Sequence, residues 1–168
     1  AEIDGYCRLV DERVTGDVLG IVAPHAGLMY SGPVAAHAYA PLSGRDYDAA
    51  VLIGPSHFVA FEGVAVFRRG SFGTPFGPIP VADELASGLM KADPLLHERP
   101  SAHDREHSLE MHLPFLARLL PGVPIVPLVM GHQSASTSTA LARALTTVLA
   151  GRRVLLVASS DLSHYHDA

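Results

Sequence analysis

Three histidines occupy the same place relative to a predicted strand. His25 follows the apolar run "GIVAP", His57 follows "VLIGPS", and His164 follows "LLVASSDLS". Because the carboxyl ends of parallel strands gather at one edge of a sheet, the three imidazoles can converge there. Histidine is the commonest metal ligand and a frequent acid–base group, and the chain holds ten of them. One such histidine is most simply a solvated loop residue, but three in the same place predict a functional site.

A second group of chemistry-bearing residues lies in "HDREH", which matches the H-x-x-E-H pattern of inverted zinc peptidases. That chemistry needs His103 and His107 one turn apart on a continuous helix, with Glu106 as the general base. We expect Asp104 to be the N-cap of a helix over 105–120, which leaves His103 outside it. The peptidase interpretation is therefore disfavoured.

The expected helix over 105–120 is amphipathic. Glu106, His107 and Glu110 lie opposite its apolar stripe, and they can face the site at the strand ends. Pro114 removes a hydrogen bond to the carbonyl of Glu110 and is expected to bend the helix. The apolar stripe that faces the core consists of Leu109, Leu113, Leu116 and Leu120.

Two further signals are weaker. His164 and His166 in "HYH" lie on one side of an extended segment and can chelate a metal. His132 follows another predicted strand and is a further candidate for the same site. A serine nucleophile fits poorly, because the chain lacks a G-x-S-x-G elbow, and no G-x-G-x-x-G or Walker loop occurs.

The elements that must position these residues alternate along the chain. Short and almost continuously apolar runs predict strands over 18–23, 49–54, 63–67, 123–130 and 153–159. Helical patterns lie between them, over 33–40, 81–91, 105–120 and 135–150. This alternation predicts an α/β fold, a three-layer sandwich with a central mostly parallel or mixed sheet and helices on both faces.

Composition narrows the class of protein. Of the 168 residues, 48% are hydrophobic and 17% are charged, which suits a folded domain. The net charge of −5, without a basic cluster, argues against nucleic acid as the main partner. No apolar run approaches the roughly 20 residues of a membrane span, and no signal peptide is evident. The single cysteine, Cys7, allows no internal disulfide and fits a reducing, cytoplasmic location.

Four motifs occur in an order that resembles the Memo family, also called AmmeMemoRadiSam system protein B. They are "APHAGLMYSGPVAAHAY", "LIGPSHF", "REHSLEMHLPFL" and "SSDLSHYH". The resemblance implies the fold of the class III extradiol dioxygenases, with a non-haem metal pocket at the sheet edge. Because the last predicted strand is followed by only a short polar stretch, we expect a single Memo-like domain over 1–168 that is incomplete at both ends.

The resemblance also implies roles for individual residues. The histidines of "PHAG" and "GPSH" are metal ligands, which implies that His25 and His57 hold the metal. The histidine after "SSD" is the acid–base residue of the dioxygenases, which implies a catalytic role for His164. The residues expected in the pocket wall, or as partners of the ligand rings, are Glu106, His107, Glu110, His132, Asp161 and His166.

One ligand is unaccounted for. The third protein ligand of the family is a cysteine in Memo-type proteins and a glutamate in the dioxygenases, and it lies downstream of the "SSD" motif, beyond Ala168. Cys7 is in the wrong place to replace it. His164, His166 or a residue of a partner chain remain alternatives, so a homo-oligomer is left open.

The expected cofactor is non-haem Fe(II) or a copper ion, with zinc less favoured. One hypothesis is a dioxygenase-like oxidoreductase that acts on a small-molecule substrate, with His164 moving a proton. The alternative is a non-enzymatic metal-binding or protein-interaction module on the same fold. The sequence names neither the substrate nor a protein partner.

Overall fold

The computed structural model describes residues 2–11 and 14–161. Its centre is a mixed sheet with the strand order β1-β8-β2-β7-β3-β6. The first four strands in this order are parallel to one another, and β3 and β6 run in the opposite direction. The strands are β1 (Gly20–Ala23), β2 (Ala49–Pro55), β3 (Val64–Val66), β6 (Leu96–Glu98), β7 (Ile125–Met130) and β8 (Val154–Ser159).

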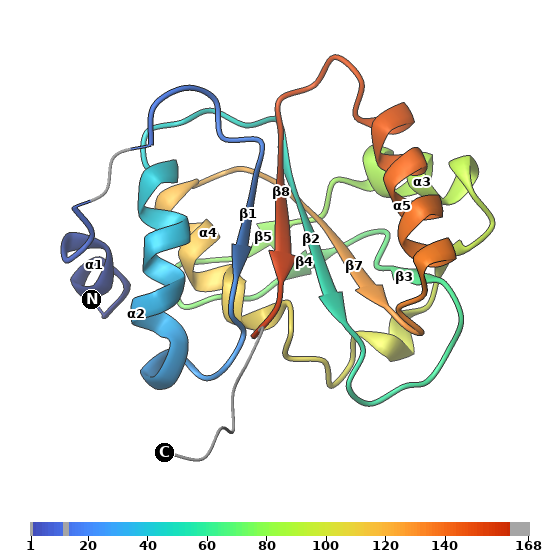
Figure 1. Ribbon diagram of the computed structural model, residues 1–168, viewed down its shortest axis with the longest axis horizontal. Coiled ribbons are helices and arrows are strands. Elements are labelled where there is room, and N and C mark those ends of the chain that lie inside the picture. Colours follow the sequence, from blue (N-terminus) through green and yellow to red (C-terminus); the bar gives the residue numbers. More distant parts are fainter. Residues whose placement is uncertain (1, 12–13, 162–168) are drawn as a thin grey trace.

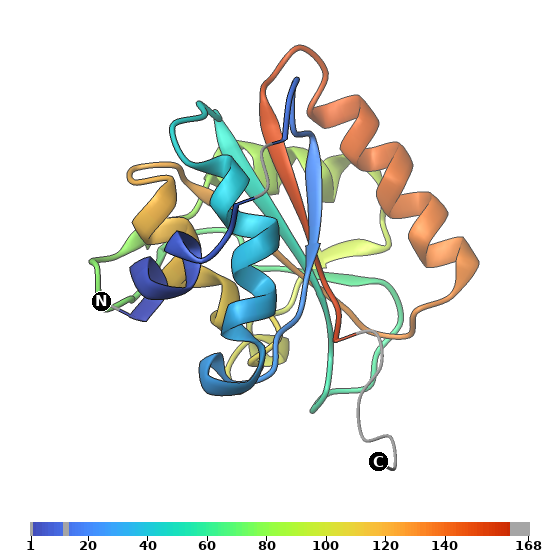
Figure 2. The same cartoon turned by 60° about the vertical axis from the view of Figure 1, so that its left-hand side comes forward.

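Helices cover both faces of this sheet (Figures 1 and 2). One layer contains α1, α2 and α4, and the other contains α3 and α5, so that in Figure 2 the sheet stands between them. The expected three-layer α/β sandwich with a mostly parallel, mixed sheet is therefore confirmed. The helices are α1 (Glu2–Arg8), α2 (Leu28–Tyr39), α3 (Asp83–Ala92), α4 (Leu113–Leu119) and α5 (Ala135–Val148).

Short elements complete the described part of the chain. A small two-stranded ladder pairs β4 with β5 in antiparallel fashion. Three 3-10 turns precede or follow longer elements. These elements are η1 (Ala40–Leu42), β4 (Ser71–Phe72), β5 (Ile79–Pro80), η2 (Pro100–Ala102) and η3 (Glu110–His112).

The central strands are buried because apolar side chains emerge on both of their faces. In β2, every residue from 49 to 52 is fully buried, as the continuous apolar run predicts for a strand covered on both sides. Side chains on one face pack with Tyr39 of α2 and Phe115 of α4. Side chains on the other face pack with Leu89 of α3 and Leu141 of α5.

The predicted helix over 105–120 is wrong in its first half. The chain forms a turn through Glu106, then η3, and becomes α-helical only at Leu113. The Glu106 carboxylate accepts backbone hydrogen bonds from His57 and Ser108, which commits this segment to the end of β2. Pro114 lies in the first turn of α4, where its missing N–H costs nothing, and it bends no helix. Asp104 caps no helix, whereas the predicted core stripe of four leucines is buried.

Other boundaries differ more modestly. The helix expected from 33 begins at Leu28 and contains Pro33, and both α1 and β6 lie outside the predicted elements. The start of α5 agrees with the cap pattern, since the Ser134 hydroxyl accepts the N–H of Thr137 at 3.1 Å. Within the described ranges, none of the helices combines the length and the hydropathy that a bilayer-crossing segment requires.

Candidate metal centre

Three imidazoles meet at the edge of the sheet where the parallel strands end. His25 follows β1, His57 follows β2, and His107 lies in the turn that precedes η3. Each offers a ring nitrogen, and these atoms all lie within 4.8 Å of one another. The ring centroids of His25 and His57 are 5.3 Å apart, and those of His57 and His107 are 4.6 Å apart. We call these three residues the histidine cluster.

The His25 ring is held in one tautomer by a chain of hydrogen bonds. The Ser159 hydroxyl, at the end of β8, donates to the carbonyl of Ser108 at 2.6 Å. The same hydroxyl lies 2.7 Å from His25 Nδ1. Because its proton is already used, the hydroxyl accepts from Nδ1–H, and His25 Nε2 keeps its lone pair. A metal ligand needs this arrangement, in which the second ring nitrogen is tied to a hydrogen-bond partner.

Asp161 fixes the loop that carries His25. Its Oδ1 atom accepts the backbone N–H groups of His25 and Ala26 at 2.6 and 3.0 Å, and its Oδ2 atom lies 3.8 Å from His25 Nε2. Burial of His25 lowers the pKa of its ring, nearby His57 and His107 add to this effect, and Asp161 opposes it. The neutral imidazole, which is the form that binds metal, is therefore favoured at neutral pH.

Glu106 orients the His57 ring through its Nδ1 atom, as Ser159 orients the His25 ring. Its Oε1 atom lies 2.7 Å from His57 Nδ1, and its Oε2 atom accepts the backbone N–H of His57 at 2.6 Å. Burial alone would raise the pKa of Glu106, but the hydrogen bonds from His57 and Ser108 outweigh it and lower that pKa to about 2. The ionised carboxylate therefore accepts Nδ1–H and leaves His57 Nε2 available.

A glycine at the end of β2 lets the Glu106 turn approach the strand. A Cβ atom on Gly54 would lie 2.7 Å from Ser108 Oγ and 2.8 Å from Leu109 Cδ2. Without that atom, the Ser108 hydroxyl reaches the Pro55 carbonyl at 2.9 Å. The sequence "LIGPSH" thus places His57 and also makes room for the segment that orients it.

His107 completes the cluster on the solvent side. Its ring stacks on that of His57 with an interplanar angle of 27°, and its Nδ1 atom lies 3.6 Å from Glu106 Oε1. The side chains of His57 and His107 are 37% and 46% exposed, whereas that of His25 is 5% exposed. The cluster is therefore anchored on the His25 side and open to solvent over the other two rings.

Two residues expected at the site are not part of the histidine cluster. His132 is exposed after β7, where its N–H donates to the Phe61 carbonyl at 2.7 Å. It lines a separate surface pocket of about 460 Å³ together with Ser56 and Glu62. Glu110 is exposed, and its side chain makes no hydrogen bond or ion pair within the described ranges. His164 and His166 lie outside the described residues.

The geometry required by the peptidase pattern is not present between 103 and 107. This stretch is a turn instead of a helix. The His103 ring lies 3.3 Å from the Ala65 carbonyl and is not one of the clustered ligands, and burial lowers its pKa to about 4. His103 and His107 therefore do not act as a pair.

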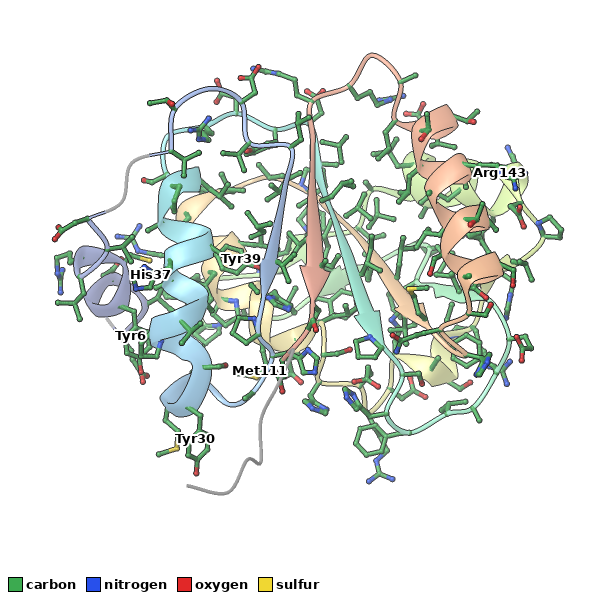
Figure 3. The ribbon with its side chains drawn as sticks, viewed as in Figure 1. Tyr6, Tyr30, His37, Tyr39, Met111 and Arg143 are labelled. Atoms are coloured by element: carbon green, nitrogen blue, oxygen red, sulfur yellow. The ribbon has the colours of Figure 1, made fainter. Side chains whose placement is uncertain are left out.

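Sequence reasoning missed two kinds of residue. Ser108 and Ser159 form the relay to His25, and the signal for Ser159 was a hydroxyl at the very end of a buried strand. Sequence reasoning also missed His112, which is fully buried. Its position three residues after the core residue Leu109 was the available sign of this burial. Figure 3 shows Tyr39 of α2 pointing into the same interior, whereas Tyr30 points outward at the end of α2 nearest the site.

Comparison with known proteins gives a consistent result. The family described as Memo-like protein matches residues 3–168. A MEMO1 family protein from Caldivirga maquilingensis is 41% identical over 151 residues, covering 88% of this chain and 54% of the relative. One from Pyrobaculum aerophilum is 41% identical over 160 residues, covering 92% and 57%. The chain thus spans about half the length of the curated relatives it matches, and it belongs to the Memo-like protein family.

Proposed function

We propose that this chain binds a redox-active first-row metal, iron or copper, on His25, His57 and His107. The observation that carries the proposal is the paired restraint on the two deeper rings. Ser159 and Glu106 each occupy an Nδ1 atom, so that both Nε2 lone pairs are available in one place. Imidazole nitrogen suits iron and copper as well as zinc.

His107 takes the place that the family resemblance left open. The resemblance implies a third ligand beyond the end of this chain, but the cluster already contains three nitrogen donors. A partner chain is therefore not needed to complete the ligand set. The ionised Glu106 carboxylate and Asp161 lie beside the rings and offset the charge of a divalent ion.

The finer proposal is a dioxygenase-like oxidation of a small molecule in the cytoplasm. When bound, the metal would supply a Lewis acid and an electron-transfer centre for the substrate. In this reaction His25, His57 and His107 hold the ion, and Glu106 and Ser159 fix the orientation of the first two rings. His164 moves a proton to or from the substrate. The exposed side of His57 and His107 gives the substrate its approach.

A non-enzymatic metal-binding module is the second candidate. It is favoured by the exposure of two of the three ligand rings, because many catalytic sites exclude water more fully. Oxygen uptake separates the two candidates. Protein loaded anaerobically with Fe(II) should consume oxygen in the presence of a catechol if it is an oxidoreductase, and retained metal without uptake would reject the reaction but not the metal site.

Metal binding itself is tested with two variants. His25→Ala combined with His57→Ala should lower the retained iron or copper to background in elemental analysis of protein purified without a metal-binding tag. His132→Ala is the matched control, because His132, like His57, is an exposed histidine beyond a parallel strand but lies outside the cluster. Equal metal content in the double variant and the control would refute the proposal.

A further inference from the structure

The two loops that supply the His57–Glu106 contact also supply an exposed pair of side chains. Phe58 directly follows His57, and Arg105 directly precedes Glu106. The Arg105 Cζ atom lies 5.1 Å from the centroid of the Phe58 ring. Phe58 is 52% exposed, and its ring meets that of His107 edge to face at a centroid distance of 6.1 Å. The pair therefore borders the open side of the histidine cluster.

The charge of Arg105 is available to a ligand. Within residues 2–11 and 14–161, Arg105 forms no ion pair and no hydrogen bond, and its side chain is exposed. The carboxylate of Glu106 accepts hydrogen bonds from His57 and Ser108, and that of Asp161 accepts them from the His25 loop. Neither carboxylate pairs with the guanidinium. Contact with an aromatic face leaves the N–H edge of a guanidinium free to bind a carboxylate in bidentate fashion.

We propose that Arg105 and Phe58 form the recognition element for the ligand of this site, and that this ligand is a small molecule carrying a carboxylate. The inference rests on the proposed function, because the ligand reaches the metal over His57 and His107. Phe58 contacts the apolar body of the ligand, and Arg105 binds its carboxylate. A divalent ion and a guanidinium on the same open side attract an anionic ligand over a neutral one.

The chain offers a matched control for this pair. Arg99 lies with its Cζ atom 4.9 Å from the ring of Phe61, in almost the same geometry. Phe61 contacts His97, with ring centroids 6.1 Å apart, and borders the separate pocket that contains His132. Removing either guanidinium deletes one arginine–phenylalanine contact, but only Arg105 borders the cluster.

The test compares two metal chelators that differ by one carboxylate. Calorimetric titration of the Ni²⁺-loaded chain with benzohydroxamate and with 4-carboxybenzohydroxamate gives two dissociation constants. We expect the carboxylated chelator to bind about tenfold tighter, as suits one added charge-assisted bidentate contact. In Arg105→Gln the two constants should become nearly equal, because the added carboxylate loses its bidentate partner. Arg99→Gln should keep the tenfold preference.

Each other outcome decides the matter. Three results would overturn this inference without affecting the proposed metal site. They are equal affinities in the unaltered chain, a preference that survives in Arg105→Gln, and failure of both chelators to bind a metal-loaded chain. The proposed metal site would stand in those cases, because retained nickel reports it separately. A chain that retains no nickel would overturn both.

Discussion

Polar side chains at the histidine cluster and those in the core between α2 and α4 differ in their hydrogen bonding. The His25 and His57 rings of the cluster, and the Glu106 carboxylate beside them, all have hydrogen-bond partners within 2.7 Å. In that core, the Tyr39 hydroxyl and both ring nitrogens of His112 lack a partner among the described residues. The fold therefore orients the His25 and His57 rings through hydrogen bonds, whereas the buried His112 ring makes none with the part of the chain that the structure describes.

Tyr39 and His112 pack in the core as apolar side chains do. Tyr39 stacks on Phe115 with ring centroids 4.8 Å apart, and its centroid lies 5.9 Å from that of His112. Burial lowers the pKa of His112 to about 4, with the nearby His25 adding to this effect, so that the ring is neutral at physiological pH. Such groups make good packing contacts but lose their hydrogen bonds to water, at a cost of about 1–3 kcal/mol each.

The largest effect is expected from removing Glu106, the hydrogen-bond partner of His57. Glu106→Ala leaves the N–H groups of His57 and Ser108 without an acceptor. The free energy of unfolding should fall by about 3 kcal/mol, and the metal dissociation constant should rise roughly tenfold to a hundredfold. Chemical denaturation and metal titration measure the two effects. The control Glu110→Ala removes an exposed carboxylate and should change neither; an equal loss in both variants would argue against a specific role for Glu106.

A smaller loss is expected when the approach of the Glu106 turn to β2 is blocked. In Gly54→Ala the new methyl group would meet Ser108 Oγ at 2.7 Å, so the turn must move. We expect a destabilisation of about 1–3 kcal/mol, as for other overpacked sites, together with weaker metal binding. Gly73→Ala is the control, because no atom lies within 4 Å of its new methyl group. Unchanged metal affinity in Gly54→Ala would show that the turn does not position His57.

Lowering the pH should destabilise the folded chain, because it contains buried histidines that stay neutral. Burial lowers the pKa values of His103 and His112 to about 4 in the folded chain, from 6.5. Between these pH values the unfolded chain binds more protons, so metal-free protein should lose stability as the pH falls, by at most about 1.4 kcal/mol per pH unit for each histidine. His112→Leu should flatten this slope in denaturation curves recorded from pH 7 to 4.5, and His132→Leu should leave it unchanged. A slope that His112→Leu does not alter would contradict the assignment.

The smallest effect separates a paired hydroxyl from an unpaired one. Tyr39→Phe removes a hydroxyl that has no partner among residues 2–11 and 14–161, and it should leave the stability unchanged or raise it by up to about 1 kcal/mol. Tyr47→Phe removes a hydroxyl that donates to the Val18 carbonyl at 2.8 Å and should lower the stability by about 1 kcal/mol. Thermal unfolding of both variants gives the comparison. A larger loss for Tyr39→Phe than for Tyr47→Phe would mean that the Tyr39 hydroxyl has a partner in solution.

Much of the fold could be predicted because its strands are covered on both faces. Continuous apolar runs identify β2, β7 and β8, and the alternation with helices gives the layers. The strand-end histidines follow from the same logic, since parallel strands bring His25 and His57 to one edge. The short edge strand β6 carries no such run, "LHE" being too short and too polar to stand out.

The rest of the site depends on contacts between distant segments. A helical pattern over 105–120 satisfies local rules, but the Glu106 carboxylate binds His57, which follows β2 and is 49 positions away. That contact turns the chain and moves His107 from an expected pocket wall into the cluster. No local signal in "REHS" reveals this, and the Ser159–Ser108 contact is equally remote, spanning 51 positions. His164 stays a prediction, as it lies outside the described residues.

X-ray absorption spectroscopy of the metal-loaded chain tests the central claim most directly. The account predicts three imidazole nitrogens bound to the metal in the unaltered chain and two in His107→Gln, with His132→Gln identical to the unaltered chain. A spectrum dominated by sulfur, or one that is the same in the unaltered chain and in His107→Gln, would contradict the three-histidine site.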